Sequence, residues 1–74
     1  MIFNDIVSYL EDKFKLPVEY ELASNVLLLR IHGVDNVSIG RYIKKDFKNI
    51  KVTTKEIEGY KITVDGWVKI ECGS

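Results

Sequence analysis

Residues 18–32 read VEYELASNVLLLRIH, two apolar runs separated by a short polar turn. In the first run, over 18–22, apolar residues alternate with glutamates, which is the pattern of a strand with one buried and one solvated face. The second run, over 26–32, is almost continuously apolar and predicts a central strand covered on part of both faces. Residues 23–25 supply the turn. The stretch therefore predicts an antiparallel hairpin.

A helical pattern precedes the hairpin. Over residues 2–16, apolar positions recur at the i, i+3, i+4 spacing of one helical face. They are Phe3, Ile6, Val7, Leu10 and Phe14. Asn4 is expected to cap the start. Pro17 is expected to end the helix, because the residue before a proline is disfavoured in the α conformation.

A second helix is predicted after the hairpin, over 38–49, with Ser38 as its N-cap. Its expected buried face consists of Ile39, Tyr42, Ile43 and Phe47. The opposite face carries Arg41, Lys44, Lys45 and Lys48 at helical spacing. Gly40 is expected to weaken the first turn slightly.

The last third of the chain predicts three strands, over 50–54, 60–64 and 67–72. A two-residue Asp65-Gly66 turn and a three-residue loop over 64–66 are the alternatives for joining the last two. The longer loop is preferred, because it sets Tyr60 opposite Ile70 and keeps apolar side chains on one face. In that register Trp67 faces outward.

The predicted fold is α+β, with two helices packed on a mostly antiparallel sheet in the order α-β-β-α-β-β-β. Residues 1–72 are expected to form one domain, and 73–74 a tail, either native or a remnant of cloning. The expected core contains Phe3, Ile6, Leu10, Phe14, Leu28, Ile43, Phe47, Ile62 and Val68.

Composition excludes several classes of protein. The 74 residues are 46% hydrophobic and 30% charged, which is typical of a folded chain rather than a disordered one. No apolar run approaches the ~20 residues that span a bilayer. The first residues lack the basic and apolar regions of a secretory signal. The cytoplasm is the expected location, and no membrane partner is expected.

Nothing in the sequence points to catalysis. His32 and Cys72 are the single histidine and cysteine, which rules out an internal disulfide and makes a poor start for a metal site. His32 is expected to be partly buried with a local hydrogen-bond partner, and Cys72 to act as a small apolar strand residue. Glu19 and Glu21 fit the solvated face of a strand better than an acid/base pair. We therefore expect no enzyme, cofactor or metal.

Charge is the more informative signal. The net charge is zero, but residues 1–24 carry five acidic and two basic side chains, and residues 25–55 carry seven basic and two acidic ones. Residues 56–74 carry four acidic and two basic side chains. The basic face of the second helix has three interpretations: a solvated face, a phosphate-binding surface, or a surface that contacts the acidic first helix in a symmetric pair. A homodimer is expected.

Trp67 is the other candidate for binding. An outward tryptophan on a sheet is typical of an interface hot spot. The alternative is that its ring packs under the turn or against the first helix.

In size and in its plan of two helices and a sheet, the chain resembles small proteins that phages make early in infection. Within that set it is similar to the staphylococcal phage inhibitors of the bacterial DNA sliding clamp. The resemblance lies in size and plan rather than in a motif. It implies a dimeric, non-enzymatic inhibitor that occupies the DNA channel of the clamp and blocks loading.

The channel of a sliding clamp is positively charged, so acidic side chains would meet it in place of phosphates. Together with Trp67, the expected partner-binding residues are Asp5, Glu11, Asp12, Glu19 and Glu21. The chain has no peptide resembling Gln-x-x-Leu-x-Phe, so such an inhibitor would act through its folded surface. The alternative is a small nucleic-acid-binding protein that uses the four cations of the second helix, Arg41, Lys44, Lys45 and Lys48.

Overall fold

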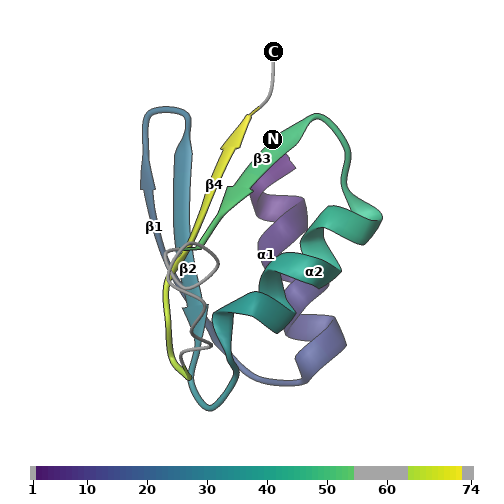
Figure 1. The fold of residues 1–74 in the computed structure, drawn as a ribbon, viewed down its shortest axis with the longest axis vertical. Coiled ribbons are helices and arrows are strands. Elements are labelled where there is room, and N and C mark those ends of the chain that lie inside the picture. Colours follow the sequence, from purple (N-terminus) through teal and green to yellow (C-terminus); the bar gives the residue numbers. More distant parts are fainter. Residues whose placement is uncertain (1, 55–63, 73–74) are drawn as a thin grey trace.

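The computed structural model describes residues 2–54 and 64–72. Along the chain the elements are α1 (Ile2–Phe14), β1 (Val18–Ala23), β2 (Val26–Ile31), α2 (Asn36–Asp46), β3 (Ile50–Thr53) and β4 (Val68–Cys72). The strands form one antiparallel sheet in the order β1-β2-β4-β3, and both helices cover the same face of it (Figure 1). The predicted α+β class is confirmed, with the order α-β-β-α-β-β in the described residues.

The predicted hairpin is confirmed as the β1–β2 pair. Ala23 pairs with Val26, so only Ser24 and Asn25 remain in the turn. Ser24 has a positive φ of 53°, whereas Asn25 does not, which matches a type II′ turn. A two-residue turn fixes the register of the whole hairpin, because side chains alternate between the two faces of the sheet.

The core lies between the helices and one face of the sheet. The sheet contributes Val18, Leu27, Leu29, Ile31, Val68 and Ile70, and the helices contribute Phe3, Ile6, Leu10, Ile39 and Ile43. All eleven are buried. The expected core members Phe14 and Phe47 are half-buried and pack against this cluster, and Ile62 lies outside the described residues.

Leu28 was expected in the core, and this prediction is wrong. It is half-buried on the sheet face that points away from the helices, while Leu27 and Leu29 face them. The residues around it are apolar in both alternation phases, so the pattern alone does not say which phase meets the helices.

Helix α1 is shorter than predicted at its C-terminal end. It ends at Phe14, and Lys15 adopts a left-handed conformation with φ 56° while its N–H still donates to the Glu11 carbonyl at 2.9 Å. The chain therefore leaves the helix before Pro17 is reached. Asn4 is not the N-cap, because the helix already includes Ile2.

Helix α2 begins and ends earlier than predicted, and its N-cap is Asp35 rather than Ser38. The Asp35 carboxylate accepts hydrogen bonds from the Ser38 N–H and the Ser38 Oγ, both at 2.8 Å. Aspartate and serine are both good caps, so sequence alone did not separate them. The helix ends at Asp46 because Phe47 is extended.

The predicted strand over 60–64 lies outside the described residues except for Val64, which forms an isolated antiparallel bridge with Asp35. Strand β4 lies between β2 and β3. Ile70 pairs with Leu27 on one side and with Val52 on the other. Both sides of the strand are therefore occupied at Ile70, and Tyr60, its predicted partner, lies outside the described residues.

Gly40 lies where α2 passes close to β3. A Cβ atom at this position would lie 3.4 Å from Val52 Cγ1 and 3.9 Å from Thr54 Cγ2, which is ordinary contact with no space beyond. A methyl group therefore fits, whereas a larger side chain would push the helix away from the sheet.

We expect Gly40→Ala to stabilise the fold by about 0.5–1 kcal/mol, the usual gain on replacing glycine inside a helix. Gly40→Leu should instead cost about 1–3 kcal/mol through overpacking. Urea denaturation followed by far-UV circular dichroism measures both. A similar loss of stability in the two variants would contradict the contact geometry.

The cap of α2 gives a second prediction. The hydrogen bond from the Ser38 N–H holds the pKa of the Asp35 carboxyl below its ordinary value of 3.8. A lowered pKa in the folded state adds stability that is present above pH 3.8 and is lost as the pH falls through the folded pKa. Asp35→Ala should cost about 1 kcal/mol at pH 7.

Ser38→Ala should cost less, because the Ser38 N–H still meets Asp35. Urea unfolding at several pH values makes the comparison. The cost of Asp35→Ala should shrink as the pH falls below 3.8, because the carboxyl is protonated first in the unfolded state and then, at its lower pKa, in the folded state. An equal cost in the two variants would restore Ser38 as the cap.

Candidate functional site

The sheet face that points away from the helices, called here the outer face, carries three of the candidate residues, Glu19, Glu21 and Trp67. The strand registers place Glu19 beside Arg30, and Glu21 beside Leu28, which is itself beside Lys69. The outer face consists of Glu19, Glu21, Val26, Leu28, Arg30, Lys51, Thr53, Trp67, Lys69 and Glu71.

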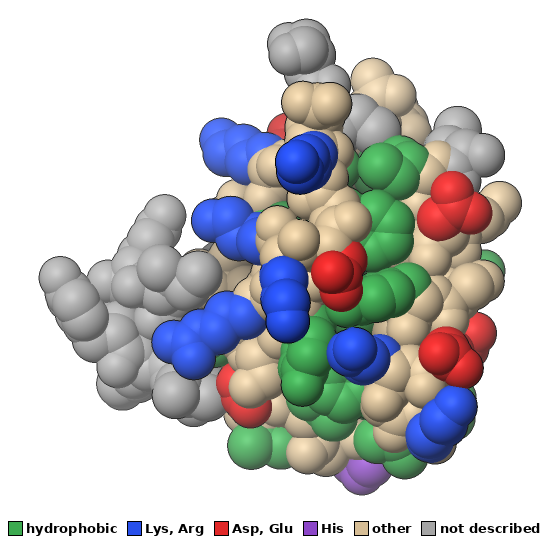
Figure 2. Space-filling model, turned by 90° about the vertical axis from the view of Figure 1, so that its right-hand side faces the viewer, with side chains coloured by type: hydrophobic (Ala, Val, Ile, Leu, Met, Phe, Trp, Pro, Cys, Tyr) green, Lys and Arg blue, Asp and Glu red, His purple; other side chains and the backbone are tan. Residues whose placement is uncertain are grey.

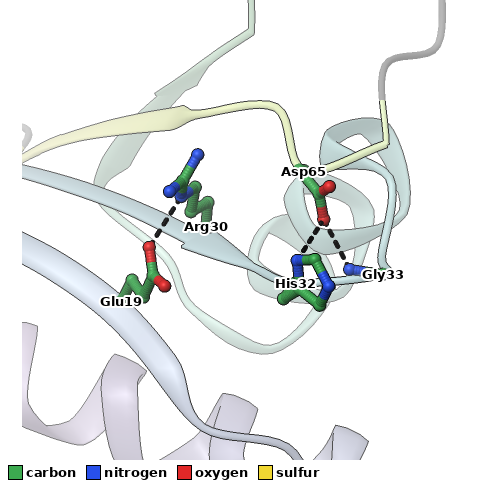
Figure 3. Close-up of polar contacts among 5 residues, drawn as sticks. All are labelled: Glu19, Arg30, His32, Gly33 and Asp65. Carbon is green, nitrogen blue, oxygen red and sulfur yellow. Dashed lines mark hydrogen bonds and ion pairs between the residues drawn. The ribbon is translucent and has the colours of Figure 1, made fainter.

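Arg30 contacts both Glu19 and Trp67 on this face. Its Nε donates to Glu19 Oε2 at 2.7 Å, as Figure 3 shows, and its guanidinium carbon lies 4.9 Å from the centroid of the Trp67 ring. The ring is therefore held in a cation–π contact while the residue remains 41% exposed. Of the two interpretations of Trp67, the structure shows the exposed ring, and neither the turn nor α1 hides it.

The surroundings of Trp67 are partly apolar. Val26 and Leu28 are half-buried on the outer face. Lys69 and Glu71 form an ion pair at 3.7 Å, whereas Glu21 is exposed and makes no ion pair among the described residues. An aromatic residue with aliphatic neighbours and a charged surround is typical of protein interfaces.

Asp65 fixes the chain just before Trp67. Its carboxylate accepts a hydrogen bond from the Gly33 N–H at 2.5 Å and lies 3.3 Å from His32 Nδ1 (Figure 3). Its own N–H donates to the Val34 carbonyl at 3.1 Å. These contacts tie the loop after β2 to the segment that leads into β4.

His32 was expected to be partly buried with a local hydrogen-bond partner, but its polar neighbour is the distant Asp65 and its side chain is not partly buried. Its side chain is 91% exposed. The reason is that β2 ends at Ile31, so His32 already lies in the loop.

The predicted acidic residues do not form one surface. Asp5, Glu11 and Asp12 are exposed on α1, in the helix layer, with Asp12 paired to Lys15 at 3.1 Å. The two glutamates of β1 lie on the other side of the sheet, on the outer face. The sheet itself separates the two groups.

The helix layer has an aromatic seam between α1 and α2. Tyr9 meets Phe47 edge to face with ring centroids 5.2 Å apart, and Phe14 meets Tyr42 in the same way at 5.3 Å. The Tyr9 hydroxyl donates to the Asp46 carboxylate. Partial burial and this hydrogen bond raise the pKa of Tyr9 to about 12. Tyr9 therefore stays protonated as a hydrogen-bond donor.

Basic side chains line one side of this seam. In Figure 2 most Lys and Arg side chains lie to the left of the hydrophobic stripe, whereas acidic ones lie on both sides of it. The four predicted cations, Arg41, Lys44, Lys45 and Lys48, are all exposed. None of them makes an ion pair within residues 2–54 and 64–72. A shallow depression of about 280 Å³ is lined by Ser38, Arg41, Tyr42 and Lys45.

Within the described part of the chain, no three His, Cys, Asp or Glu side chains gather as metal ligands would. None of the described helices is long and apolar enough to cross a membrane. No protein-family model, curated protein or solved structure matches the chain.

Arg30 and Asp65 are the site residues that sequence reasoning missed. A signal for Arg30 was present, because a two-residue turn at 24–25 pairs it with Glu19. Asp65 meets Gly33 across 32 positions of sequence, and no local pattern indicates that contact.

We expect Asp65→Ala to lower the free energy of unfolding by about 1–3 kcal/mol, because the Gly33 N–H loses its acceptor and alanine tolerates the positive φ of 65° poorly. Asp65→Asn should be close to wild type, since its carbonyl still accepts and asparagine tolerates this conformation. Urea unfolding of both variants is the measurement. Equal losses would show that the negative charge, rather than the acceptor, matters.

Proposed function

We propose that this chain is a non-enzymatic protein-binding module that contacts its partner through the outer face, with Trp67 as the central anchor. The observation that carries this is the state of Trp67, which is 41% exposed yet held by Arg30, itself bonded to Glu19. Tryptophan and arginine are the residue types most enriched among interface hot spots.

The side chains of Glu19, Arg30 and Trp67 are already held in place by contacts with one another, and this supports a role in binding. A side chain that is already held loses little rotamer freedom when a partner covers it, so less of the interaction energy is spent on ordering. Asp65 fixes the backbone two residues before the ring. The half-buried Leu28 beside Arg30 adds apolar area that a partner would bury.

Within this class of function, the bacterial DNA sliding clamp is the partner to test first, with the chain acting as a dimeric inhibitor in the cytoplasm. The support is the resemblance in size and plan, together with Glu19 and Glu21 on the same sheet face as Trp67, which suit a basic channel. Because the acidic residues of α1 lie across the sheet, one copy would present only one of the two acidic groups to a given wall of the channel.

A second candidate function is nucleic-acid binding by α2. It is favoured by three exposed cations on one side of that helix, Arg41, Lys44 and Lys45. Lys48, predicted on the same helical face, lies beyond the end of the helix, and none of the four makes an ion pair in the described residues. Such a surface releases condensed counterions from a phosphate backbone. The net charge of zero weakens long-range attraction to nucleic acid, so we rank this function second.

The two functions predict opposite mutational patterns. With purified bacterial sliding clamp, and with proteins captured from nuclease-treated bacterial lysate, Trp67→Ala should weaken binding by about 2 kcal/mol or more. Tyr42→Ala is the matched control, because Tyr42 is a similarly exposed aromatic, at 37%, on the helix layer. Calorimetry with each purified partner is the measurement.

Replacing Lys44 and Lys45 with glutamate should leave protein binding intact. If capture yields only nucleic acid, and the Lys44 and Lys45 replacements abolish it, the chain is a nucleic-acid-binding protein and the proposed function is wrong. Binding to another protein but not to the clamp, still lost in Trp67→Ala, would keep the class of function and reject the clamp.

A further inference from the structure

We infer that the free edge of β1 is a docking site for an extended segment of the partner protein, one in which apolar residues alternate with lysine or arginine. This inference rests on the proposed protein-binding function and specifies how the partner is held. It involves the rim of the sheet, whereas Trp67 lies on its outer face.

The edge is open. Strand β1 is the outermost strand beside β2, and no described strand pairs with its other side. Every residue from Glu19 to Ala23 is exposed. Natural sheets usually protect such an edge with lysine, proline, a bulge or a covering loop. Residues 18–23 contain no lysine or proline, and their pairing with β2 is continuous. Their charged side chains are Glu19 and Glu21, which would repel another acidic strand but attract a basic one.

The helix side of this strand carries apolar side chains without cover. Tyr20 and Leu22 face the same way as the buried Val18, but they are 48% and 47% exposed. The helices cover the middle of the sheet and reach only the first residue of β1. Two large apolar residues therefore line the rim on the side where a further strand would place its own alternate side chains.

The backbone N–H and C=O groups of Tyr20 and Leu22 point away from β2, in the plane of the sheet. In a hairpin with a two-residue turn, the residues that flank the turn form a hydrogen-bonded pair, here Ala23 and Val26. Hydrogen bonding to the neighbouring strand then alternates along β1. The N–H and C=O groups of Tyr20 and Leu22 therefore lie on the free edge, where they can bind an added strand.

The glutamates of β1 favour a basic segment as the occupant of this edge. On the outer-face side of this strand, Glu19 is already bonded to Arg30, but Glu21 makes no ion pair in the described residues. A second copy of β1 fits poorly. Antiparallel registers centred on Glu19, Tyr20 or Glu21 set a glutamate against a glutamate, which is destabilising. A segment with Lys or Arg at alternate positions places a cation opposite Glu21.

The probe is a dye-labelled peptide, Thr-Lys-Val-Lys-Val-Lys-Thr, titrated with the folded chain at physiological salt and followed by fluorescence anisotropy. We expect saturable binding of this peptide and none of the version with Glu in place of Lys. Two further versions carry N-methyl groups on alternate residues, in either phase. One phase should abolish binding and the other should keep it, because only alternate N–H groups face β1.

Two variants of the chain test whether the peptide binds at the edge of β1 or elsewhere on the surface. Glu21→Lys should weaken peptide binding by about fivefold, the size of an opposed-charge pair across strands. Glu11→Lys is the matched control, since Glu11 is an exposed glutamate on α1. Circular dichroism of both variants confirms that the fold is kept.

Each alternative outcome overturns the inference. Equal binding of the two N-methylated peptides would show charge attraction without strand addition. Absence of peptide binding at millimolar concentration would exclude the site. Self-association that Glu21→Lys changes would assign the edge to a second copy. If the partner protein is lost in Trp67→Ala but kept in Glu21→Lys, the proposed function stands and this inference fails.

Discussion

The pairing of β2 with β4 holds the two halves of this chain together. Leu27 lies beside Ile70 and Leu29 beside Val68, and all four side chains are buried under the helices. Hydrophobic burial is the dominant stabilising term in a domain this small, and a chain of this length has little to spare. The register of this pair therefore also decides what faces outward. Because Leu29 pairs with Val68, Arg30 is brought to the ring of Trp67.

Local patterns predicted the fold where local interactions decide it. The alternation over 18–22 and the polar turn after it gave the hairpin, and 3.6-residue spacing gave both helices. The insertion of β4 between β2 and β3 was not predictable, because the sequence pattern favoured the simpler pairing with the segment just before it. Leu28 was misplaced because its neighbours on both sides are leucines, so the buried phase depends on the helices and not on the strand itself.

In the candidate site, too, local features were predictable from the sequence and contacts between distant segments were not. An exposed Trp67 was one of two interpretations of the sequence pattern, and its contact with Arg30 followed only from the pairing of two distant strands. The charge asymmetry along the chain was evident from sequence. Its arrangement was not, because α1 and β1 are adjacent in sequence yet present their acidic side chains on opposite sides of the sheet. The sheet thus separates acidic side chains that lie close together in the sequence.

The position of β4 also constrains the order in which the chain is assembled as it leaves the ribosome. The β1–β2 hairpin is complete early, but β3 emerges before the strand with which it pairs. Until β4 arrives, the inner edge of β2 is unoccupied, and β3 is the nearest strand that could occupy it wrongly. A β2–β3 pair formed in that interval would have to open again before β4 could enter, so this strand order sets a native pairing against a competing one that becomes available earlier.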